Sequence, residues 1–551
     1  MMLLLLGLAL VEALSAPIPR FEERAALKED VRNMFHHAYD NYMKYAFPHD
    51  ELKPLSLSYT DSLEELGNLK LERLSETYSG SALTLVESLS SLAVMKNSSE
   101  FEKGVLWLAE NLSFDVDVRV NVFECNIRLL GGLISAHFLA KDSRKQLMSN
   151  GYNDQLLMLA EDLGLRLLPA FDTPTGIPYA WINLKTGVHP NETTETSTSG
   201  CGSLVLEMGA LSRLTGNPQF ENLALRALRK LWSMRSELNL LGTNLDINTG
   251  RWTEYSSGIG AGIDSFYEYL VKAYILFGGE EYWDMFQDAY RAVQQHYRYG
   301  SWYHDADMRT GKATYWQFTS LQAFWPGLQV LIGDIAAANA THREFLRLWE
   351  MFGIFPERYL LDAGKVHPTE RYYPLRPELA ESTFFLYQAT KDPWYLDVGK
   401  KIMNSINVFS RVPGGFASVR DVMTMKLEDH QHSFFLSETC KYLYLLFDDS
   451  FLDGENHVFS TEGHLFPVNQ SWQQQPRPKI LSRLRLFSRQ KPIDTSALTS
   501  KTCPRLSRGS VESACHIPDT RADHRCVSRS DCGVDATTCA KRSCSFAGYC
   551  S

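Results

Sequence analysis

From about residue 29 to residue 448 the chain repeats one pattern. Apolar residues recur at helical spacing over segments of about 12 to 20 residues, and Gly, Pro or Asn separates one segment from the next. The alternation of apolar and polar positions that marks a half-buried strand is scarce. Two segments, 122–139 and 433–447, are apolar on almost every side, which requires burial all round. The pattern therefore predicts an all-α body whose inner helices are enclosed by outer helices.

A recurring unit indicates how these helices are arranged. A turn, an aromatic residue and an amphipathic helix follow one another at Phe101, Phe220, Tyr282 and Tyr395. The spacing of these aromatic residues is about 60 residues or about twice that, which is the length of one helical hairpin. Stacked hairpins form either an open solenoid or a closed ring, and the fully apolar inner segments favour closure because a solenoid leaves its ends exposed. We expect a toroid of helical hairpins.

The two ends of the chain differ from this body. Residues 1–15 contain a short apolar run followed by small residues, which predicts a signal peptide and entry into the endoplasmic reticulum (ER) lumen, although no Lys or Arg precedes the run. The body is expected over residues 28–468 and a Gln-, Pro- and Arg-rich linker over 469–501. Residues 502–551 contain all of the ten cysteines except Cys125, Cys201 and Cys440, which predicts a disulfide-rich tail. Zinc binding is the alternative, but no Cys-x-x-Cys pair occurs there.

Charge and composition exclude some partners. The 551-residue chain has a formal net charge of -10, and its Lys and Arg residues are dispersed, so no basic stripe is available for nucleic acid. No later stretch approaches the roughly 18 consecutive apolar residues of a membrane span, so we expect none. Five Asn-x-Ser/Thr triplets fit glycosylation in the secretory pathway: Asn97, Asn111, Asn191, Asn339 and Asn469.

The first candidate site is the pair Glu124 and Arg128, which share one helix face at spacing i,i+4. A surface ion pair is the ordinary interpretation of such spacing. Here the helix has almost no polar face, so both charges are expected to be buried, and buried charges require a partner or a function.

A glycine-rich turn at residues 258–262 leads into a helix at Asp264. A dinucleotide-binding loop fits poorly, because no strand precedes the glycines. Two ordinary roles stay open for this segment: Asp264 as a helix N-cap, or a capping box formed by Ser265 and Glu268.

A third candidate begins at Arg376-Pro377-Glu378. Proline suits the first turn of a helix, so Glu378 and Glu381 are expected near the positive end of the helix dipole. Stabilisation by the helix dipole would account for one glutamate in the first turn of the helix. Two carboxylates and an arginine in one turn, followed by aromatic residues, favour a lined pocket.

Two more acids complete the set. Glu438 is expected in the middle of an apolar helix, and Glu462 follows Thr461 in a short turn. Six carboxylates with interleaved aromatic residues fit a glycosidase, which needs one protonated acid and one carboxylate base. Their oxygen atoms suit calcium better than zinc. A supported serine triad, a His-Glu-x-x-His motif and a Walker motif are all missing.

Over roughly residues 30 to 467 the chain resembles glycoside hydrolase family 47, the class I α-1,2-mannosidases, and within it the ER degradation-enhancing branch. The resemblance rests on FECNIRLLGGLISAH, GIGAGIDSFYEYLVKAYILFG, SLQAFWPGLQVLIGD, YPLRPELAESTFFLYQATKDP, SFFLSETCKYLYLLFD and FSTEGH. It implies an (α/α)7 barrel, one calcium ion at its base, and inverting cleavage of α-1,2-linked mannose.

The resemblance also implies residue roles. Glu124 looks like a general acid that acts through water, Asp264 like a second acid candidate, and Glu378 like the base that activates water. Thr461 resembles the direct calcium ligand, through its hydroxyl and carbonyl oxygens, and Glu462 resembles the residue that holds the water shell of the ion. The remaining pocket residues implied in this way are Arg128, Arg376, Glu381, Phe434 and Glu438.

The chain departs from the family pattern at three places. Where the family usually has Asp-Ala-Leu-Asp-Thr-Leu, this chain has Glu87-Ser-Leu-Ser90-Ser-Leu, so one acid is longer and another is lost. Two cysteines that pair in this branch correspond to Leu57 and Gly414. Ser320 and Ala323 stand where the active processing mannosidases have His and Cys, as they do in the degradation branch.

The sequence therefore predicts a factor of the ER lumen that recognises and trims mannose on N-glycans of misfolded glycoproteins and directs them to ER-associated degradation. High-mannose glycans on misfolded glycoproteins are the expected partner, and an ER oxidoreductase or a component of ER-associated degradation is a further candidate partner. The alternative is a lectin-like receptor that keeps the pocket and has lost turnover through changes such as Ser90.

Overall fold

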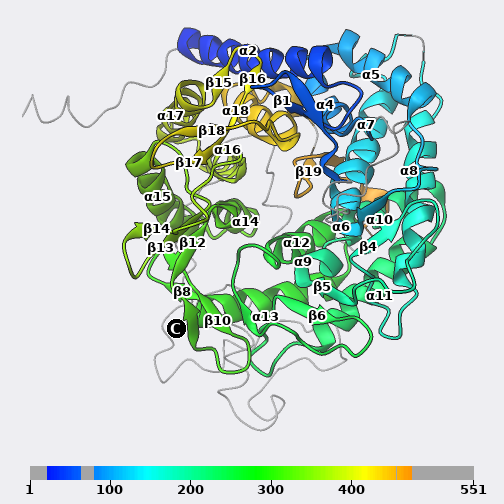
Figure 1. Cartoon of the computed structure of the whole chain (residues 1–551), viewed down its shortest axis with the longest axis vertical. Coiled ribbons are helices and arrows are strands. Elements are labelled where there is room, and N and C mark those ends of the chain that lie inside the picture. Colours follow the sequence, from blue (N-terminus) through cyan, green and yellow to red (C-terminus); the bar gives the residue numbers. More distant parts are fainter. Residues whose placement is uncertain (1–20, 64–79, 150, 455, 474–551) are drawn as a thin grey trace, which may run out of the picture.

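The computed structural model describes residues 21–63, 80–149, 151–454 and 456–473, and these form a ring of helices (Figure 1). The predicted signal peptide, the cysteine tail and all but the first residues of the predicted linker lie outside the described residues. The helices run around the ring in chain order, from α2 at the top of the view through α13 near the bottom to α18 beside α2.

Within the described residues the long helices form an outer and an inner layer of seven each. The outer helices are α2 (Phe21–Tyr45), α5 (Ser98–Asn111), α8 (Gln155–Leu167), α11 (Gln219–Ser233), α13 (Glu280–His296), α15 (Ile335–Phe352) and α17 (Trp394–Phe409). The inner helices are α4 (Leu83–Val94), α7 (Gly131–Lys141), α10 (Val205–Thr215), α12 (Asp264–Phe277), α14 (Trp325–Leu331), α16 (Glu378–Thr390) and α18 (Cys440–Phe447). Shorter helical turns are α6 (Val122–Glu124), α9 (Thr198–Gly202), the π-helices η1 (Cys125–Leu130) and η4 (Phe435–Thr439), and the 3-10 helices η2 (Leu168–Phe171), η3 (Ser320–Phe324), η5 (Ser450–Leu452) and η6 (Gln470–Trp472).

Burial separates the two layers as the apolar pattern predicts. Every residue of α4 and of α18 is buried, whereas α5 and α11 bury only one face. The ring closes because α18 packs on α2 and η4 packs on α4. The predicted (α/α)7 toroid is therefore confirmed.

The recurring aromatic residues mark the starts of outer helices. Phe101, Phe220, Tyr282 and Tyr395 lie in the first turns of α5, α11, α13 and α17, and all four side chains are buried. Phe220 lies against Gly164 of α8, and Tyr395 lies against His342 of α15, so these two rings pack an outer helix on its outer neighbour. The spacing of about 60 residues is thus the length of one outer–inner hairpin.

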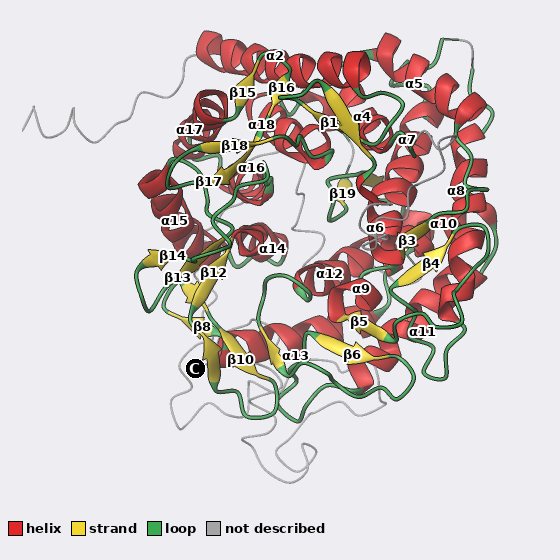
Figure 2. Ribbon diagram, viewed as in Figure 1, coloured by secondary structure: helices red, strands yellow, loops and turns green. Residues whose placement is uncertain are grey.

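Strands occupy only the connections between helices (Figure 2). The antiparallel pairs are β1 (Glu51–Lys53) with β2 (Ser58–Thr60), β3 (Arg119–Asn121) with β4 (Trp181–Asn183), β5 (Glu195–Ser197) with β6 (Asn244–Asp246), β8 (Arg298–Tyr299) with β9 (Trp302–Tyr303), β15 (Arg411–Val412) with β16 (Gly415–Phe416), β17 (Ser418–Asp421) with β18 (Lys426–Glu428), and β19 (His457–Phe459) with β20 (Leu465–Pro467). Two three-stranded sheets join β7 (Ser256–Ser257), β10 (Asp305–Asp307) and β11 (Ala313–Tyr315), and β12 (Gln317–Thr319), β13 (Arg358–Leu360) and β14 (Lys365–Val366). These strands are too short to produce a clear alternation in the sequence.

Leu57 and Gly414, the two positions where the resemblance implies paired cysteines, are neighbours. A Cβ atom added to Gly414 would lie 2.5 Å from Cδ2 of Leu57 and 2.2 Å from the carbonyl oxygen of Pro54. Glycine is therefore required for this approach, and leucine packs against it in place of a disulfide.

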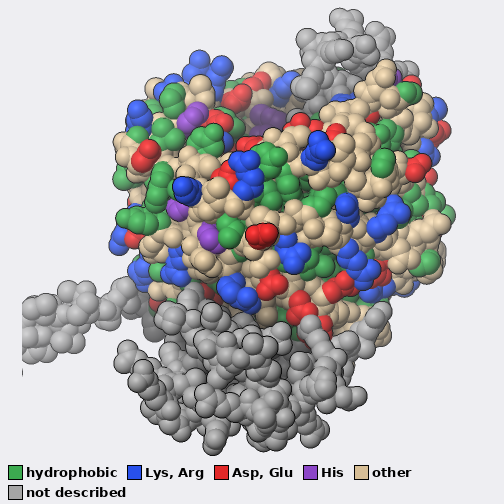
Figure 3. All heavy atoms as spheres, turned by 90° about the horizontal axis from the view of Figure 1, so that it is seen from below, with side chains coloured by type: hydrophobic (Ala, Val, Ile, Leu, Met, Phe, Trp, Pro, Cys, Tyr) green, Lys and Arg blue, Asp and Glu red, His purple; other side chains and the backbone are tan. Residues whose placement is uncertain are grey.

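Helix Val122–Lys141, which comprises α6, η1 and α7, is long and apolar enough to cross a membrane by length and composition. The sequence analysis expected no such stretch. In the structure 78% of the apolar window is buried inside the protein, as in a core helix. On the face shown in Figure 3, acidic and basic side chains are interspersed over the described residues, as expected from the dispersed Lys and Arg.

The asparagines of the five predicted glycosylation triplets differ in exposure. Asn111, Asn191 and Asn469 are exposed. Asn97 and Asn339 are half-buried: Asn97 accepts a hydrogen bond from the Glu100 amide, and Asn339 accepts from Arg343 and Tyr395. We expect the three exposed asparagines to be modified first. Glycosylation at all five remains a prediction.

Candidate active site

A cavity of about 390 Å³ opens among the beginnings of α12 and α16, the π-helices η1 and η4, and the turn between β19 and β20. It is lined by nine of the ten residues for which the sequence predicted a catalytic, sugar-binding or metal-binding role: Glu124, Arg128, Asp264, Arg376, Glu378, Phe434, Glu438, Thr461 and Glu462. Glu381, the tenth, is buried outside this lining, where its Oε1 accepts a hydrogen bond from the Tyr442 hydroxyl.

A helix N-cap fixes the position of Glu124. The Asn121 side chain accepts hydrogen bonds from the amides of residues 123 and 124, which starts the helix at this point. Arg128 follows in a π-helical segment, and π-bulges are frequent at functional sites. Its guanidinium lies 2.7 Å from Glu124, 3.3 Å from Glu462 and 3.7 Å from Glu87. One arginine among three carboxylates in a cavity wall is not the isolated surface pair that the spacing alone allowed.

Asp264 is held by the glycine turn. Gly262 has φ 84, and a Cβ there would lie 2.6 Å from the Thr243 side chain, so only glycine fits. The N-cap is residue 263, and the Ser265 hydroxyl donates to Ser203, which rules out the two ordinary capping roles. Burial raises the pKa of Asp264 to about 7.

Glu378 begins α16, directly after Pro377. Burial raises its pKa to about 8, and the nearby Arg376 opposes this rise. Arg376 makes a two-pronged ion pair with Glu357 at 3.0 and 2.8 Å, and Glu357 also accepts from the Ser320 hydroxyl. Leu375, which precedes this group, has φ 66, a strained conformation of the kind found at active sites.

The turn that carries Thr461 reaches the centre of the ring, where β19 lies in Figure 1. The Thr461 hydroxyl donates to Glu268 at 2.8 Å, and the other oxygen of Glu268 accepts from Lys272 at 2.6 Å. All of these side chains come from α12 or from this turn. The turn therefore closes one end of the cavity against the inner layer.

The acids around Thr461 fit a hard cation. Five of them are buried: Glu87, Glu268, Glu381, Glu438 and Glu462. Burial raises the pKa values of Glu87, Glu381, Glu438 and Glu462. Both carboxylate oxygens of Glu87 and Oε2 of Glu462 have no hydrogen-bond partner of good geometry among the described residues. Arg128 lies 3.3 Å from Glu462 and 3.7 Å from Glu87 without making such a hydrogen bond to either, and the cluster of buried carboxylates favours a further cation. An all-oxygen set suits calcium.

Phe434 forms an apolar wall of the cavity. The guanidinium carbons of Arg128 and Arg376 lie 5.5 and 5.9 Å from its ring centroid. The His432 ring is stacked on it, with centroids 4.9 Å apart and an angle of 6°. An aromatic face beside polar groups suits the apolar face of a sugar ring.

The sequence analysis missed Glu207 and Glu357. Glu207 is fully buried in α10 and accepts from Tyr269 at 2.7 Å and from Asn126 at 2.8 Å. A lone acid in an apolar helix was the signal that identified Glu438, and it applies equally to Glu207. Glu357 lies in a loop and carries no such signal; only its pairing with Arg376 reveals it.

Glu207 predicts a pH effect. Burial raises its pKa to about 7, so the folded protein binds this proton more tightly than the unfolded chain does. Its contribution to stability is present below the ordinary pKa of about 4.5 and is lost as pH rises to 7, by about 3 kcal/mol. Glu207→Gln should therefore gain stability relative to the unchanged chain over this interval, as measured by urea unfolding at pH 5 and 8. An identical difference at both pH values would contradict the prediction.

The loss of an acid at Ser90 leaves a buried lysine. Lys441 is fully buried and its Nζ donates to the Ser90 hydroxyl at 2.8 Å, at the position where the resemblance implies an aspartate. Burial lowers the pKa of Lys441 to about 7. The Lys441 ammonium therefore contacts a neutral hydroxyl directly, while Glu438, Glu87 and Glu462 act on it only through their charge.

We expect Ser90→Ala to destabilise the fold by about 1.5 to 3 kcal/mol, because a buried ammonium loses a hydrogen-bond acceptor. Ser88→Ala is the matched control: Ser88 lies on the same helix and is buried, but its hydroxyl has no hydrogen-bond partner among the described residues. Denaturant unfolding of both variants measures the difference. Equal effects would show that the Lys441 contact contributes nothing.

Known proteins resemble this arrangement in sequence and in shape. The model of "Glycosyl hydrolase family 47" matches residues 34–468. This match covers most of the ring and every residue that lines the cavity. The chain belongs to glycosyl hydrolase family 47.

Relatives in the family are mannosidases or mannosidase-like proteins. "Alpha-mannosidase I MNS5" of Arabidopsis thaliana is 67% identical over 96% of this chain and 93% of its own length. "ER degradation-enhancing alpha-mannosidase-like protein 2" of Homo sapiens is 41% identical over 82% of this chain and 78% of its own. The solved "alpha-1,2-mannosidase from Trichoderma reesei" is 25% identical with a TM-score of 0.71, covering 81% of this chain and 99% of its own. This family 47 chain is a mannosidase-like glycoside hydrolase.

Proposed function

We propose that this family 47 chain removes α-1,2-linked mannose, with inversion, from high-mannose N-glycans of misfolded glycoproteins in the ER lumen and so directs them to ER-associated degradation. The observation that carries the proposal is that Glu124, Asp264 and Glu378 line the same cavity. Relatives named as α-mannosidases and as ER degradation-enhancing proteins support the substrate and the pathway.

The roles follow from the environments of the three acids. Burial makes Glu378 a stronger base than an ordinary carboxylate, which suits the removal of a proton from water near neutral pH. Arg128 donates to Glu124 and fixes the carboxyl that protonates the leaving oxygen through water. Asp264, with a pKa of about 7, is the second group able to hold a proton there. Paired acids of this kind are what glycoside hydrolysis requires.

Calcium is the proposed cofactor. Thr461 would hold the ion through its hydroxyl and carbonyl oxygens, and Glu462 and the other buried acids around it would hold its water shell. When bound, calcium supplies positive charge that keeps neighbouring carboxylates ionised and oxygen coordination for sugar hydroxyls. Phe434 and Arg376 would orient the ring, while Arg128 holds Glu124 and Glu462 in place.

One observation favours a second candidate, a receptor that binds the glycan without cleaving it. Ser90 gives Lys441 a hydroxyl contact in place of a carboxylate, and Glu87, which is longer than the aspartate that the resemblance implies, reaches Arg128 at 3.7 Å. These changes alter the charges around Arg128, which holds the proposed general acid Glu124. Such a change would slow hydrolysis and leave the sugar cavity intact.

Mass spectrometry of a denatured glycoprotein bearing eight or nine mannose residues, incubated with the purified chain and calcium, tests the proposal. Loss of mannose residues supports the hydrolase. Calcium-dependent binding of the glycoprotein without loss of mannose would identify the receptor. Absence of both would overturn the proposed function.

A further inference from the structure

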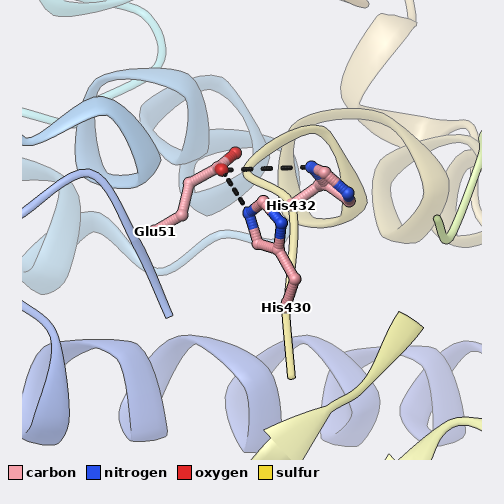
Figure 4. Close-up of side chains that lie close together, drawn as sticks. All are labelled: Glu51, His430 and His432. Carbon is pink, nitrogen blue, oxygen red and sulfur yellow. Dashed lines mark hydrogen bonds and ion pairs between the residues drawn. The ribbon is translucent and has the colours of Figure 1, made fainter. Parts of the chain in front are cut away.

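A cluster of metal-ligating side chains lies outside the cavity lining. Glu51 of β1 meets His430 and His432, which lie in the segment between β18 and η4 (Figure 4). One carboxylate oxygen and two imidazole nitrogens all lie within 4.8 Å of one another. The three atoms point toward a common centre, although the two segments are far apart in the sequence.

The separations match a coordination shell. The Glu51 Oε2 atom lies 2.6 Å from Nε2 of His430 and 3.9 Å from Nδ1 of His432. Bonds of about 2.0 to 2.1 Å in a tetrahedral site place ligand atoms about 3.3 Å apart, a value between these two distances. Small rotations of the side chains would therefore bring the distances between the ligand atoms close to this value.

Charge and access fit the same interpretation. The Glu51 side chain is 3% exposed, and its ion pairs among the described residues are those with the two histidines. A buried carboxylate requires a compensating cation. The histidine side chains are 24% and 25% exposed, so an ion can reach the cluster. The Ser433 amide donates to the other Glu51 oxygen at 2.7 Å and holds the carboxylate in place.

A hydrogen-bonded triad explains only part of this arrangement. His430 and Glu51 form a hydrogen bond, but the 3.9 Å from Glu51 to His432 is too long for one. Two imidazoles with one carboxylate are a set that zinc and its neighbours prefer, whereas the all-oxygen set around Thr461 suits calcium.

We propose that Glu51, His430 and His432 bind a divalent transition-metal ion of the zinc type, as a second metal site separate from the calcium site. The ion would join the β1 hairpin to the segment that leads into η4. Because the His432 ring is stacked on Phe434, the site would also fix the aromatic wall of the sugar cavity. The remaining coordination position would be taken by water.

Cobalt titration of the whole chain tests this site, because bound Co²⁺ has visible absorption and replaces zinc. The chain is first saturated with calcium and its free thiols are alkylated, since the cysteine-rich tail could bind the same ions. His430→Gln and His432→Gln are compared with His189→Gln, which removes an exposed histidine elsewhere. We expect His189→Gln to bind one more equivalent of Co²⁺ than either of the other two variants. At the proposed site, each of those two variants should bind Co²⁺ at least about 10-fold more weakly.

Equal cobalt binding by all three chains would overturn the proposal and assign the ion to another site. Zinc should also raise the unfolding temperature of the control but not of the variants. If a variant does not fold, X-ray absorption at the zinc edge of the unchanged, alkylated chain decides: two imidazole nitrogens per ion support the site, and their absence refutes it.

Discussion

Glu378→Gln is expected to lower the rate of mannose release by about 10²- to 10⁴-fold and to leave glycan binding nearly unchanged. Glutamine has almost the same size and keeps the start of α16, but it cannot accept a proton from water. Because burial gives Glu378 its raised pKa, removal of the charge should not destabilise the fold. Released mannose is measured over time at saturating calcium.

Glu110→Gln is the matched control, since Glu110 is exposed on α5. It should keep full activity. If Glu378→Gln also keeps full activity, Glu378 is not the base and Asp264 becomes the candidate. If the unchanged chain releases no mannose but both variants still bind glycan, the chain is a receptor.

Removal of calcium is expected to abolish both glycan binding and hydrolysis and to destabilise the fold. At a free concentration 100 times the dissociation constant, a bound ion contributes about 2.7 kcal/mol. Without it, buried carboxyls such as Glu438 and Glu462 must take up protons, because burial raises their pKa values. Calorimetric titration of the chelated chain measures the affinity.

The sign of the pH dependence follows from these raised pKa values. Calcium binds the ionised carboxylates, so its binding should release protons and its affinity should increase as pH rises from 5 to 8. Magnesium is the control ion, since it retains its own water shell. Glycan binding that persists in chelator would place the sugar site elsewhere.

The sequence predicted the ring because inner and outer helices carry different patterns. Segments 122–139 and 433–447, which contain η1, α7, η4 and α18, are apolar on almost every side, and this requires a second layer. The strands could not be predicted, because two to four residues in a connection show no period. The pattern of apolar and polar residues predicts long helices. The short strands pair only because the helices bring their connections together.

The candidate site was predictable where an acid interrupts an apolar helix. This signal found Glu124 and Glu438, but it says nothing about which charges compensate one another. The pairing of Arg376 with Glu357 and of Lys441 with Ser90 joins residues that no local pattern connects. The cluster of Glu51 with the two histidines was missed for the same reason.

The turn between β19 and β20 supplies Thr461 from almost the last part of the described chain, yet it contacts α12 in the middle of the ring and packs near η1. On the ribosome, the helices from α2 to α18 can emerge and pair as hairpins before this turn has been made. The cavity thus lacks one end until the final hairpin arrives. The active site is therefore completed in a single late step of biosynthesis. A chain truncated before residue 457 should be helical but unable to bind either calcium or sugar.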